Sequence, residues 1–297
     1  MATLSCTRRR FLAGTLASPL VAAGGYRPSV AAAFYVWTQD FSKRGIKLAD
    51  GVEEAFASTR RAGYRSVELM SILFQPDIRE KTTEALRRHG LALPSVYHGG
   101  PMHEALAADK TIGEALALAQ LVKPLGTRWI DLNPSPKPHN ERKSDDELAV
   151  QARSINRLGS ELGKLGMRLQ LHHHSPEMAE NAREWRHIAH NTDAGLVWFC
   201  IDVHWVLRGG QDPMTILREA GTRIASLHLR NSRDGVWLED FGDGDIDYRA
   251  VAAFLRQIAF RGILVVELAY EKETKITRTL EQDLRAGREY TRRVFGA

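Results

Sequence analysis

The chain has few cysteines, no long apolar run and little excess of one charge over the other. Only Cys6 and Cys200 occur among its 297 residues, which excludes a disulfide scaffold. Without the three arginines at positions 8–10, 38 basic residues stand against 36 acidic ones, whereas a nucleic-acid binder usually carries a clustered basic excess. With 43% hydrophobic and 26% charged residues, the composition is that of a globular protein.

A basic segment followed by small apolar residues opens the chain. Residues Thr7–Leu12 match a twin-arginine export motif, and the apolar stretch 11–23 after it is too short to span a bilayer. Ala22–Ala23 and Ala31–Ala33 both offer small-residue cleavage sites. The sequence therefore predicts a signal peptide over residues 1–25, with a cleavage site as late as 33, and a periplasmic protein that uses the twin-arginine export machinery.

Short apolar runs alternate with amphipathic stretches through the rest of the chain. The expected strands are Phe34–Thr38, Ser66–Leu69, Ala92–Val96, Arg128–Leu132, Arg168–His172, Leu196–Ile201, Ile224–Leu229 and Ile263–Glu267. The expected helices are Asp50–Ala62, Ile78–His89, Thr111–Leu125, Asp145–Leu165, Glu180–His190, Pro213–Ala220, Tyr248–Ala259 and Leu280–Val294.

Eight strand–helix units favour one α/β domain over residues 34–297, folded as a (β/α)8 TIM barrel. The alternative is an open doubly wound sheet. It lacks support because no Gly-x-Gly-x-x-Gly turn follows the first strand.

Polar residues gather where the expected strands end, which in a barrel is one common mouth. The chain places there Glu68, His98, Asp131, Asn133, His172, His173, His174, Asp202, His204, His228, Arg230 and Glu267. Four of them, from the fifth to the eighth strand, are predicted to bind one divalent metal ion: His172, Asp202, His228 and Glu267. Two imidazoles and two carboxylates suit Mn²⁺, Co²⁺, Zn²⁺ or Fe²⁺ better than Ca²⁺.

Strand geometry separates the three histidines of the fifth strand. Successive side chains point to opposite faces, so His172 and His174 are expected to face the pocket and His173 to face away. Among the tryptophans, Trp37 and Trp205 are candidates for stacking on a sugar ring, and Trp198 and Trp237 for the core or the pocket wall.

These segments resemble the xylose-isomerase-like barrel superfamily, the sugar phosphate isomerase/epimerase group that includes inosose dehydratases, ketose 3-epimerases and endonuclease IV. The resemblance covers nearly the whole chain after the signal. It is carried mainly by Ala62–Leu69, His172–His174, Cys200–Trp205 with Gly209–Pro213, Leu227–Arg230, Gly242–Asp247 and Val265–Glu267.

The family's usual metal ligands are Glu, Asp, His and Glu from strands five to eight. Asp202, His228 and Glu267 match the last three, whereas His172 stands at the first position. A subgroup with His-x-His at this strand exists. His174 and Glu177 are the alternative fourth ligands, and the loss of a carboxylate here weakens an assignment as a 3-epimerase that uses a pair of glutamates.

The chemistry implied by the resemblance is proton abstraction next to a carbonyl. The candidate bases are His174 and Glu68, and Arg230, His98 and His204 are expected to orient the carbonyl or the hydroxyls. The leading prediction is a metal-dependent isomerase or epimerase of an unphosphorylated sugar. The alternatives are a lyase, such as a dehydratase or a keto-glycoside-cleaving enzyme, and an exported sugar-binding module without catalysis.

The expected partners follow from the same evidence. They are a small sugar, cyclitol or keto-glycoside, and a second copy of the chain if it forms a homo-oligomer. Nucleic acid is excluded by the balanced charge, and no membrane span is expected.

Overall fold

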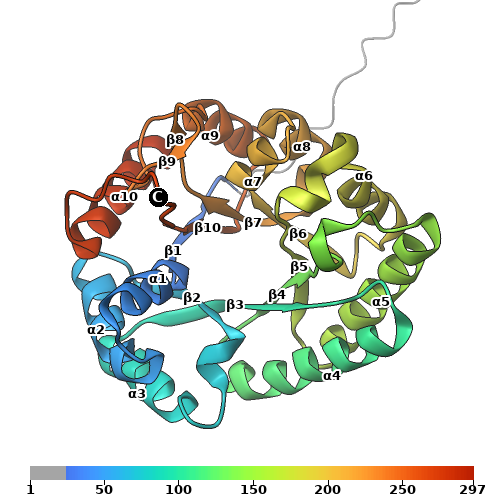
Figure 1. Cartoon of the computed structure of the whole chain (residues 1–297), viewed down its shortest axis with the longest axis horizontal. Coiled ribbons are helices and arrows are strands. Elements are labelled where there is room, and N and C mark those ends of the chain that lie inside the picture. The colour runs from blue at the N-terminus through green and yellow to red at the C-terminus, as the bar shows by residue number, and fades with distance from the viewer. Residues whose placement is uncertain (1–24) are drawn as a thin grey trace, which may run out of the picture.

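A closed parallel barrel of eight strands forms the centre of the computed structural model, which describes residues 25–297. Figure 1 looks into this barrel, with its helices arranged as an outer ring. The strands run in the order β1-β10-β7-β6-β5-β4-β3-β2 around the barrel. Their bounds are β1 Ser29–Ala33, β2 Ser66–Met70, β3 Ala92–Gly100, β4 Trp129–Pro134, β5 Arg168–Leu171, β6 Val197–Asp202, β7 Ile224–Leu229 and β10 Ile263–Val266. The predicted TIM barrel is confirmed.

Helices follow the strands, as right-handed βα units require. They are α1 Tyr35–Arg44, α2 Leu48–Arg61, α3 Arg79–His89, α4 Ala105–Val122, α5 Asp145–Lys164, α6 Ser175–Asn191, α7 Val203–Arg208, α8 Pro213–Ala220, α9 Tyr248–Gln257 and α10 Leu280–Phe295. Short 3₁₀ turns occupy Ser71–Phe74, Lys123–Leu125, Pro138–Asn140 and Gly221–Arg223, and β8 Ser232–Arg233 pairs with β9 Val236–Trp237 as a hairpin. Within the described residues, no helix has the length and apolarity needed to cross a membrane.

The strand expected at Phe34–Thr38 is wrong. The first strand is β1, and the chain enters α1 at Tyr35. β1 pairs with β10 and β2, and it buries Ala31 and Ala33 beside Ile263 and Val265 in the narrow barrel interior. Small side chains fit this interior, so an alanine-rich segment closes the barrel. The barrel therefore starts before the domain boundary expected at residue 34.

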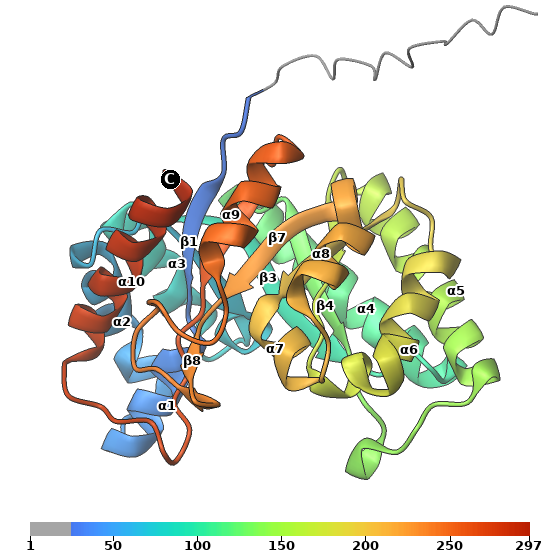
Figure 2. The same ribbon diagram turned by 90° about the horizontal axis from the view of Figure 1, so that it is seen from above.

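The carboxyl ends of the strands open at one end of the barrel. In the side view of Figure 2, α1, α7 and β8 lie at this end. The described residues begin at the opposite end, and the predicted signal peptide lies almost wholly outside them.

The last helix, α10, packs back against α2 and α9 and completes the outer ring. Thr279 caps it: its hydroxyl accepts a hydrogen bond from the Gln282 amide at 3.3 Å, and the Gln282 side chain accepts one from the Thr279 amide at 2.9 Å. Replacing Thr279 by Ala should lower the free energy of unfolding by about 1 kcal/mol, because one amide of the first turn loses its partner. Urea unfolding would measure this, and Thr279→Ser, which keeps the hydroxyl, should stay close to the parent. An unchanged urea midpoint for the alanine variant would contradict the capping role.

Candidate active site

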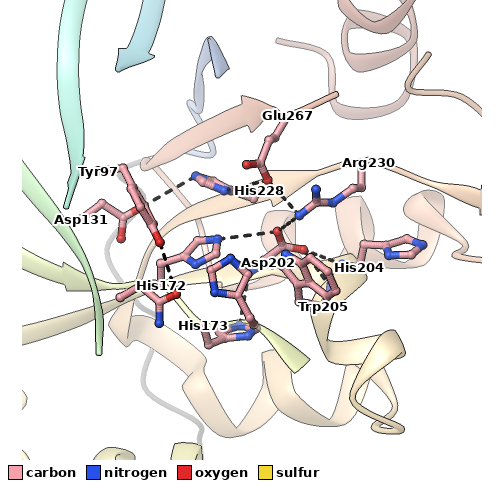
Figure 3. Close-up of polar contacts among 12 residues, drawn as sticks. Tyr97, Asp131, His172, His173, Asp202, His204, Trp205, His228, Arg230 and Glu267 are labelled. Atoms are coloured by element: carbon pink, nitrogen blue, oxygen red, sulfur yellow. Dashed lines mark hydrogen bonds and ion pairs between the residues drawn. The ribbon is translucent and has the colours of Figure 1, made fainter. Parts of the chain in front are cut away.

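Four side chains from β5, β6, β7 and β10 meet at the mouth of the barrel. One donor atom each of His172, Asp202, His228 and Glu267 lies within 4.8 Å of the others. His172 Nε2 lies 3.6 Å from Asp202 Oδ2, and His228 Nδ1 lies 3.2 Å from Glu267 Oε2 (Figure 3). The structure thus brings together the four residues that the sequence nominated as metal ligands.

The local fold explains why these side chains converge. Asp202 pairs with His228 in the register of β6 and β7, and Glu267 follows β10 directly. Asp202 also begins α7, where its Oδ1 accepts hydrogen bonds from the amides of His204 at 3.0 Å and Trp205 at 2.9 Å. One carboxylate oxygen is therefore used for the helix start, and Oδ2 faces the cluster.

The donor set fits a divalent transition metal. Neither ring nitrogen of His172 has a hydrogen-bond partner within the described structure, although the side chain is buried. Buried imidazole nitrogens without partners are costly unless a ligand satisfies them. Mixed imidazole and carboxylate donors suit Mn²⁺, Co²⁺, Zn²⁺ and Fe²⁺.

Both carboxylates of the cluster are held in the ionised form. Burial opposes ionisation of Asp202, but the Arg230 guanidinium, His172 and His228 together hold the pKa of that carboxyl well below its ordinary value. Burial likewise opposes ionisation of Glu267, while Arg230 and His228 lower its pKa. Two anionic donors are therefore available at neutral pH.

Arg230 lies between these two carboxylates rather than free in the pocket. It contacts Asp202 Oδ2, and it lies 2.9 Å from Glu267 Oε2. Its guanidinium also lies 5.2 Å from the ring of Trp205 and 4.8 Å from that of Trp237. Arg230 was predicted to orient the substrate. In the structure, its guanidinium directly contacts two of the candidate metal ligands.

Glu68 does not stand as a free base. Its Oε1 lies 2.6 Å from His228 Nε2, and its Oε2 accepts a hydrogen bond from the Ser95 hydroxyl at 2.5 Å. Asp131 adds a second carboxylate 3.7 Å from the same His228 nitrogen, and burial raises the pKa of Asp131 to about 7. Glu68 thus orients His228, with the imidazole between it and Glu267, as carboxylate–histidine–metal arrangements do.

A cavity of about 160 Å³ opens beside the four candidate ligands. The side chains that line it include His174, Trp205 and Trp237, together with Phe34, Tyr35, Met70 and Tyr97. His174 and His172 both face this cavity, whereas His173 turns away, and its Nε2 accepts a hydrogen bond from the Asp202 amide at 3.3 Å. The three side chains thus point in the expected alternating directions, although they follow β5, which ends at Leu171.

Burial and the neighbouring His172 lower the pKa of His174 to about 3, so its imidazole is unprotonated at neutral pH. The alternative ligand Glu177 is engaged elsewhere: its two oxygens accept hydrogen bonds from the Asn133 amide group and the His174 backbone amide, both at 3.0 Å. Glu177 thus fixes the backbone at His174, and neither residue belongs to the four-residue cluster.

Three residues that the sequence nominated as substrate contacts do not line this cavity. Trp37 is buried against Phe41, on the side of the helical layer. His98 lies 3.2 Å from the Ser71 hydroxyl, outside the cavity lining. His204 accepts a hydrogen bond from the indole of Trp237 at 3.1 Å, so it supports the cavity wall rather than lining it.

Tyr97 is the functional candidate that the sequence analysis missed. It lines the cavity, its ring meets His172 edge-on at 5.4 Å, and its hydroxyl donates to Asn133 Oδ1 at 3.3 Å. Burial raises the pKa of Tyr97, so the hydroxyl stays protonated. Ser95 faces the barrel interior, and side chains alternate between the two faces of a strand. Tyr97, two residues later, therefore faces the same side, whereas His98 does not.

The arrangement around His228 leads to a prediction for Glu68→Gln. The amide cannot supply the negative charge behind His228, so metal affinity should fall by about 10–100-fold. Metal titration would show this, and excess metal should restore most of the turnover. The surface variant Glu80→Gln is the control. Turnover that stays low at saturating metal would assign Glu68 to the chemistry instead.

Comparison with known proteins agrees with this architecture. Residues 56–294 match the family model described as xylose isomerase-like TIM barrel. The chain is similar to inosose dehydratase from Geobacillus kaustophilus (strain HTA426), with 24% identity over 248 residues that cover 72% of this chain and 79% of that one. It is 27% identical to the Clostridium perfringens (strain ATCC 13124) enzyme of the same name over 48% of this chain, and that match spans only 54% of the relative.

Solved structures share the fold at low identity. D-psicose 3-epimerase from Clostridium cellulolyticum H10 superposes with a TM-score of 0.69 at 14% identity, covering 90% of this chain and 99% of that one. A structure described as IolI protein with a bound zinc atom gives 0.67 at 14% identity, covering 90% and 98%. The chain belongs to the xylose isomerase-like TIM barrel family.

Proposed function

We propose that this protein removes the proton next to a carbonyl group of an unphosphorylated sugar or cyclitol, with the help of one divalent metal ion. The observation that carries the proposal is the cluster of four donor atoms within 4.8 Å of one another, beside a cavity that His174 also lines. A metal held by His172, Asp202, His228 and Glu267 would stabilise the negative charge that develops on the carbonyl oxygen. Mn²⁺, Co²⁺, Zn²⁺ and Fe²⁺ are the candidates.

His174 is the proposed base. Its imidazole is unprotonated and faces the cavity, and Glu177 holds its backbone amide in place. An imidazole of low pKa is a weak base, so it needs a substrate proton that is already acidified by the neighbouring carbonyl. Trp205 and Trp237 supply flat apolar walls against which a sugar ring can pack.

The reaction favoured for this site is elimination, which makes the enzyme a lyase. Epimerisation needs a second group to return a proton to the other face, and the carboxylates near the cavity are already engaged: Glu68 by His228 and Ser95, and Glu267 by His228 and Arg230. The similarity to inosose dehydratases supports the same choice. An isomerase or epimerase, the leading prediction from sequence, is the second candidate, supported by Tyr97 as a protonated group in the cavity.

An unphosphorylated substrate fits the charges of the site. Among the cavity-lining residues of the described structure, Arg230 is the one arginine and no lysine is present, and its guanidinium is already paired with Asp202 and Glu267. A phosphate group would meet two carboxylates there and no unengaged cation.

The test is to load the purified protein with each candidate metal and offer inososes, 3-keto-glucosides and free ketoses separately. A lyase produces a conjugated enone, seen by ultraviolet absorbance, and water or an alcohol. An epimerase produces a new diastereomer, seen by NMR, and no enone. Binding of a sugar without turnover, unchanged by chelation, would favour the non-catalytic binding module and overturn the proposal.

We also propose that the protein is exported by the twin-arginine route and cleaved near Ala23. Cleavage after Ala33 would remove β1, which pairs with both β10 and β2, so the barrel fold supports the earlier site. N-terminal sequencing of protein from a periplasmic extract tests this. A mature chain that begins after Ala33, or intact protein found only in the cytoplasm, would contradict it.

A further inference from the structure

A second, larger cavity of about 380 Å³ is lined partly by residues that come shortly after His174 and Trp205 in the chain. It is lined by the segment 136–143 that follows β4, by the start of α6 at Ser175 and Pro176, and by the end of α7 at Arg208 and Gly209. All three segments leave the carboxyl ends of barrel strands, so this cavity belongs to the same mouth as the active site.

Two segments of the chain run from one cavity to the other. His174 and Trp205 line the active-site cavity, with ring centroids 5.3 Å apart. The residues that follow His174, and those one helical turn after Trp205, line the outer cavity. A molecule whose reacting part lies at the metal ligands would reach the outer cavity by extending past the proposed base His174.

The outer cavity is polar but its charges are already balanced. Its basic side chains are Lys137, Arg142, Lys143, Arg183 and Arg208. Each has a carboxylate partner: Lys143 lies 2.6 Å from Glu184, Arg142 lies 2.9 Å from Glu180, and the others pair with Glu147, Asp145 and Glu271. Such a wall offers many donors and acceptors without a free cation, which suits neutral hydroxyl groups better than phosphate.

The backbone along this cavity is strained on two sides. His139 and Asn140 have φ of 56° and 57°, and Glu180–Ala182 have φ of 50°, 59° and 53° inside α6. Strain of this kind is retained where the surroundings over-determine it, which is frequent at ligand sites. Asn140 and Glu180 both line the cavity, so the strained segments shape its wall.

We propose that the outer cavity binds the leaving group of a glycoside substrate, a neutral, hydroxyl-bearing unit such as a second sugar ring. The inference rests on the proposed lyase function and narrows its substrate to a glycoside with a ketone two carbons from the anomeric carbon. The base takes the proton from the carbon between them. The electron pair of that C–H bond forms a carbon–carbon double bond, the anomeric C–O bond breaks, and the departing oxygen takes up a proton to become an alcohol. No oxidant or reductant is consumed.

The experiment compares two substrates with the same reacting ring: the 3-keto derivative of methyl glucoside and the 3-keto derivative of a glucose disaccharide. The disaccharide should give a kcat/KM about tenfold higher or more, equivalent to at least one well-made additional contact. Ala179→Phe places a ring in the outer cavity from an exposed lining position. It should remove that advantage and leave the methyl glycoside within about twofold of the parent.

Two further variants make the result decisive. Arg142→Ala removes an exposed donor from the cavity wall and should lower only the disaccharide rate, in case the phenylalanine variant fails to fold. Ala194→Phe lies in the exposed turn before β6, at the other end of the barrel, and should change neither rate.

Equal kcat/KM for the two substrates would overturn the outer site while leaving the lyase proposal intact. An equal fall in kcat/KM for both substrates in Ala179→Phe would do the same. So would inhibition of the disaccharide reaction alone by inorganic phosphate, since that indicates an anion site. Turnover of inososes but of no keto-glucoside would overturn it as well, because water is then the leaving group. If no carbonyl substrate reacts at all, the proposed function itself fails.

Discussion

Glu267→Gln is expected to lose its metal and its activity together while keeping its fold. The substitution changes the charge of one donor with almost no change in volume, and the amide oxygen can still accept from Arg230, which lies 2.9 Å from Glu267 Oε2. Arg230 and His228 keep the pKa of the Glu267 carboxyl below its ordinary value despite burial, so a full negative charge is removed at neutral pH.

The expected loss of metal affinity can be compared with the loss caused by changing residues that contact a metal ligand but not the metal. Changing such partners typically costs 10–100-fold in metal affinity, so loss of a ligand should cost more than about 100-fold. Metal analysis after desalting and calorimetric titration would measure it, and circular dichroism would show that the barrel is intact. The exposed Glu84→Gln is the matched control. A Glu267→Gln protein that retains stoichiometric metal would remove this residue from the site.

The four-residue cluster was predictable because strand geometry restricts where side chains can point. His172, Asp202, His228 and Glu267 come at the ends of consecutive parallel strands, and such ends converge on one mouth in a closed barrel. The period of two along each strand then selects the inward residue, as it did for His172 against His173. Composition alone would not have found the cluster.

The direction of a side chain could not be predicted where it depends on the exact residue at which a strand ends. The third strand was expected to end at Val96, but β3 runs to Gly100 and keeps its alternation, so Tyr97 enters the cavity and His98 faces outward. Trp37 was expected in a strand for a related reason, but its segment is helical, because β1 had already ended at Ala33.

The first strand itself was obscured by composition. Ser29–Ala33 contains three alanines, which favour helices over strands and which also match the end of a signal peptide. What makes it a strand is tertiary: Ala31 and Ala33 fill narrow space beside Ile263 and Val265, and β10 and β2 pair with its two edges. Glu68 was nominated as a candidate base, and its contact with His228 was not predicted, since the two residues are 160 positions apart in the chain.

The variant that separates chemistry from metal binding is His174→Gln. Glutamine keeps a polar side chain at the cavity wall but cannot accept a proton from carbon, so kcat should fall by about 10²–10⁴-fold. Metal content should stay at the parent level, because His174 is outside the four-residue cluster. KM should change little, since the cavity walls formed by Trp205 and Trp237 are untouched.

Exchange of the substrate proton with solvent distinguishes a catalytic role of His174 from a purely structural one. In deuterated water the parent enzyme should exchange or remove the substrate proton next to the carbonyl, and His174→Gln should lose both processes in parallel. His190→Gln changes an exposed histidine of α6, the helix that begins directly after His174; it is the control and should behave like the parent. If His174→Gln kept the exchange rate while losing only product formation, His174 would act on the leaving group. The proton would then have to be taken by another group at the cavity, with Tyr97 the next to be replaced, by phenylalanine.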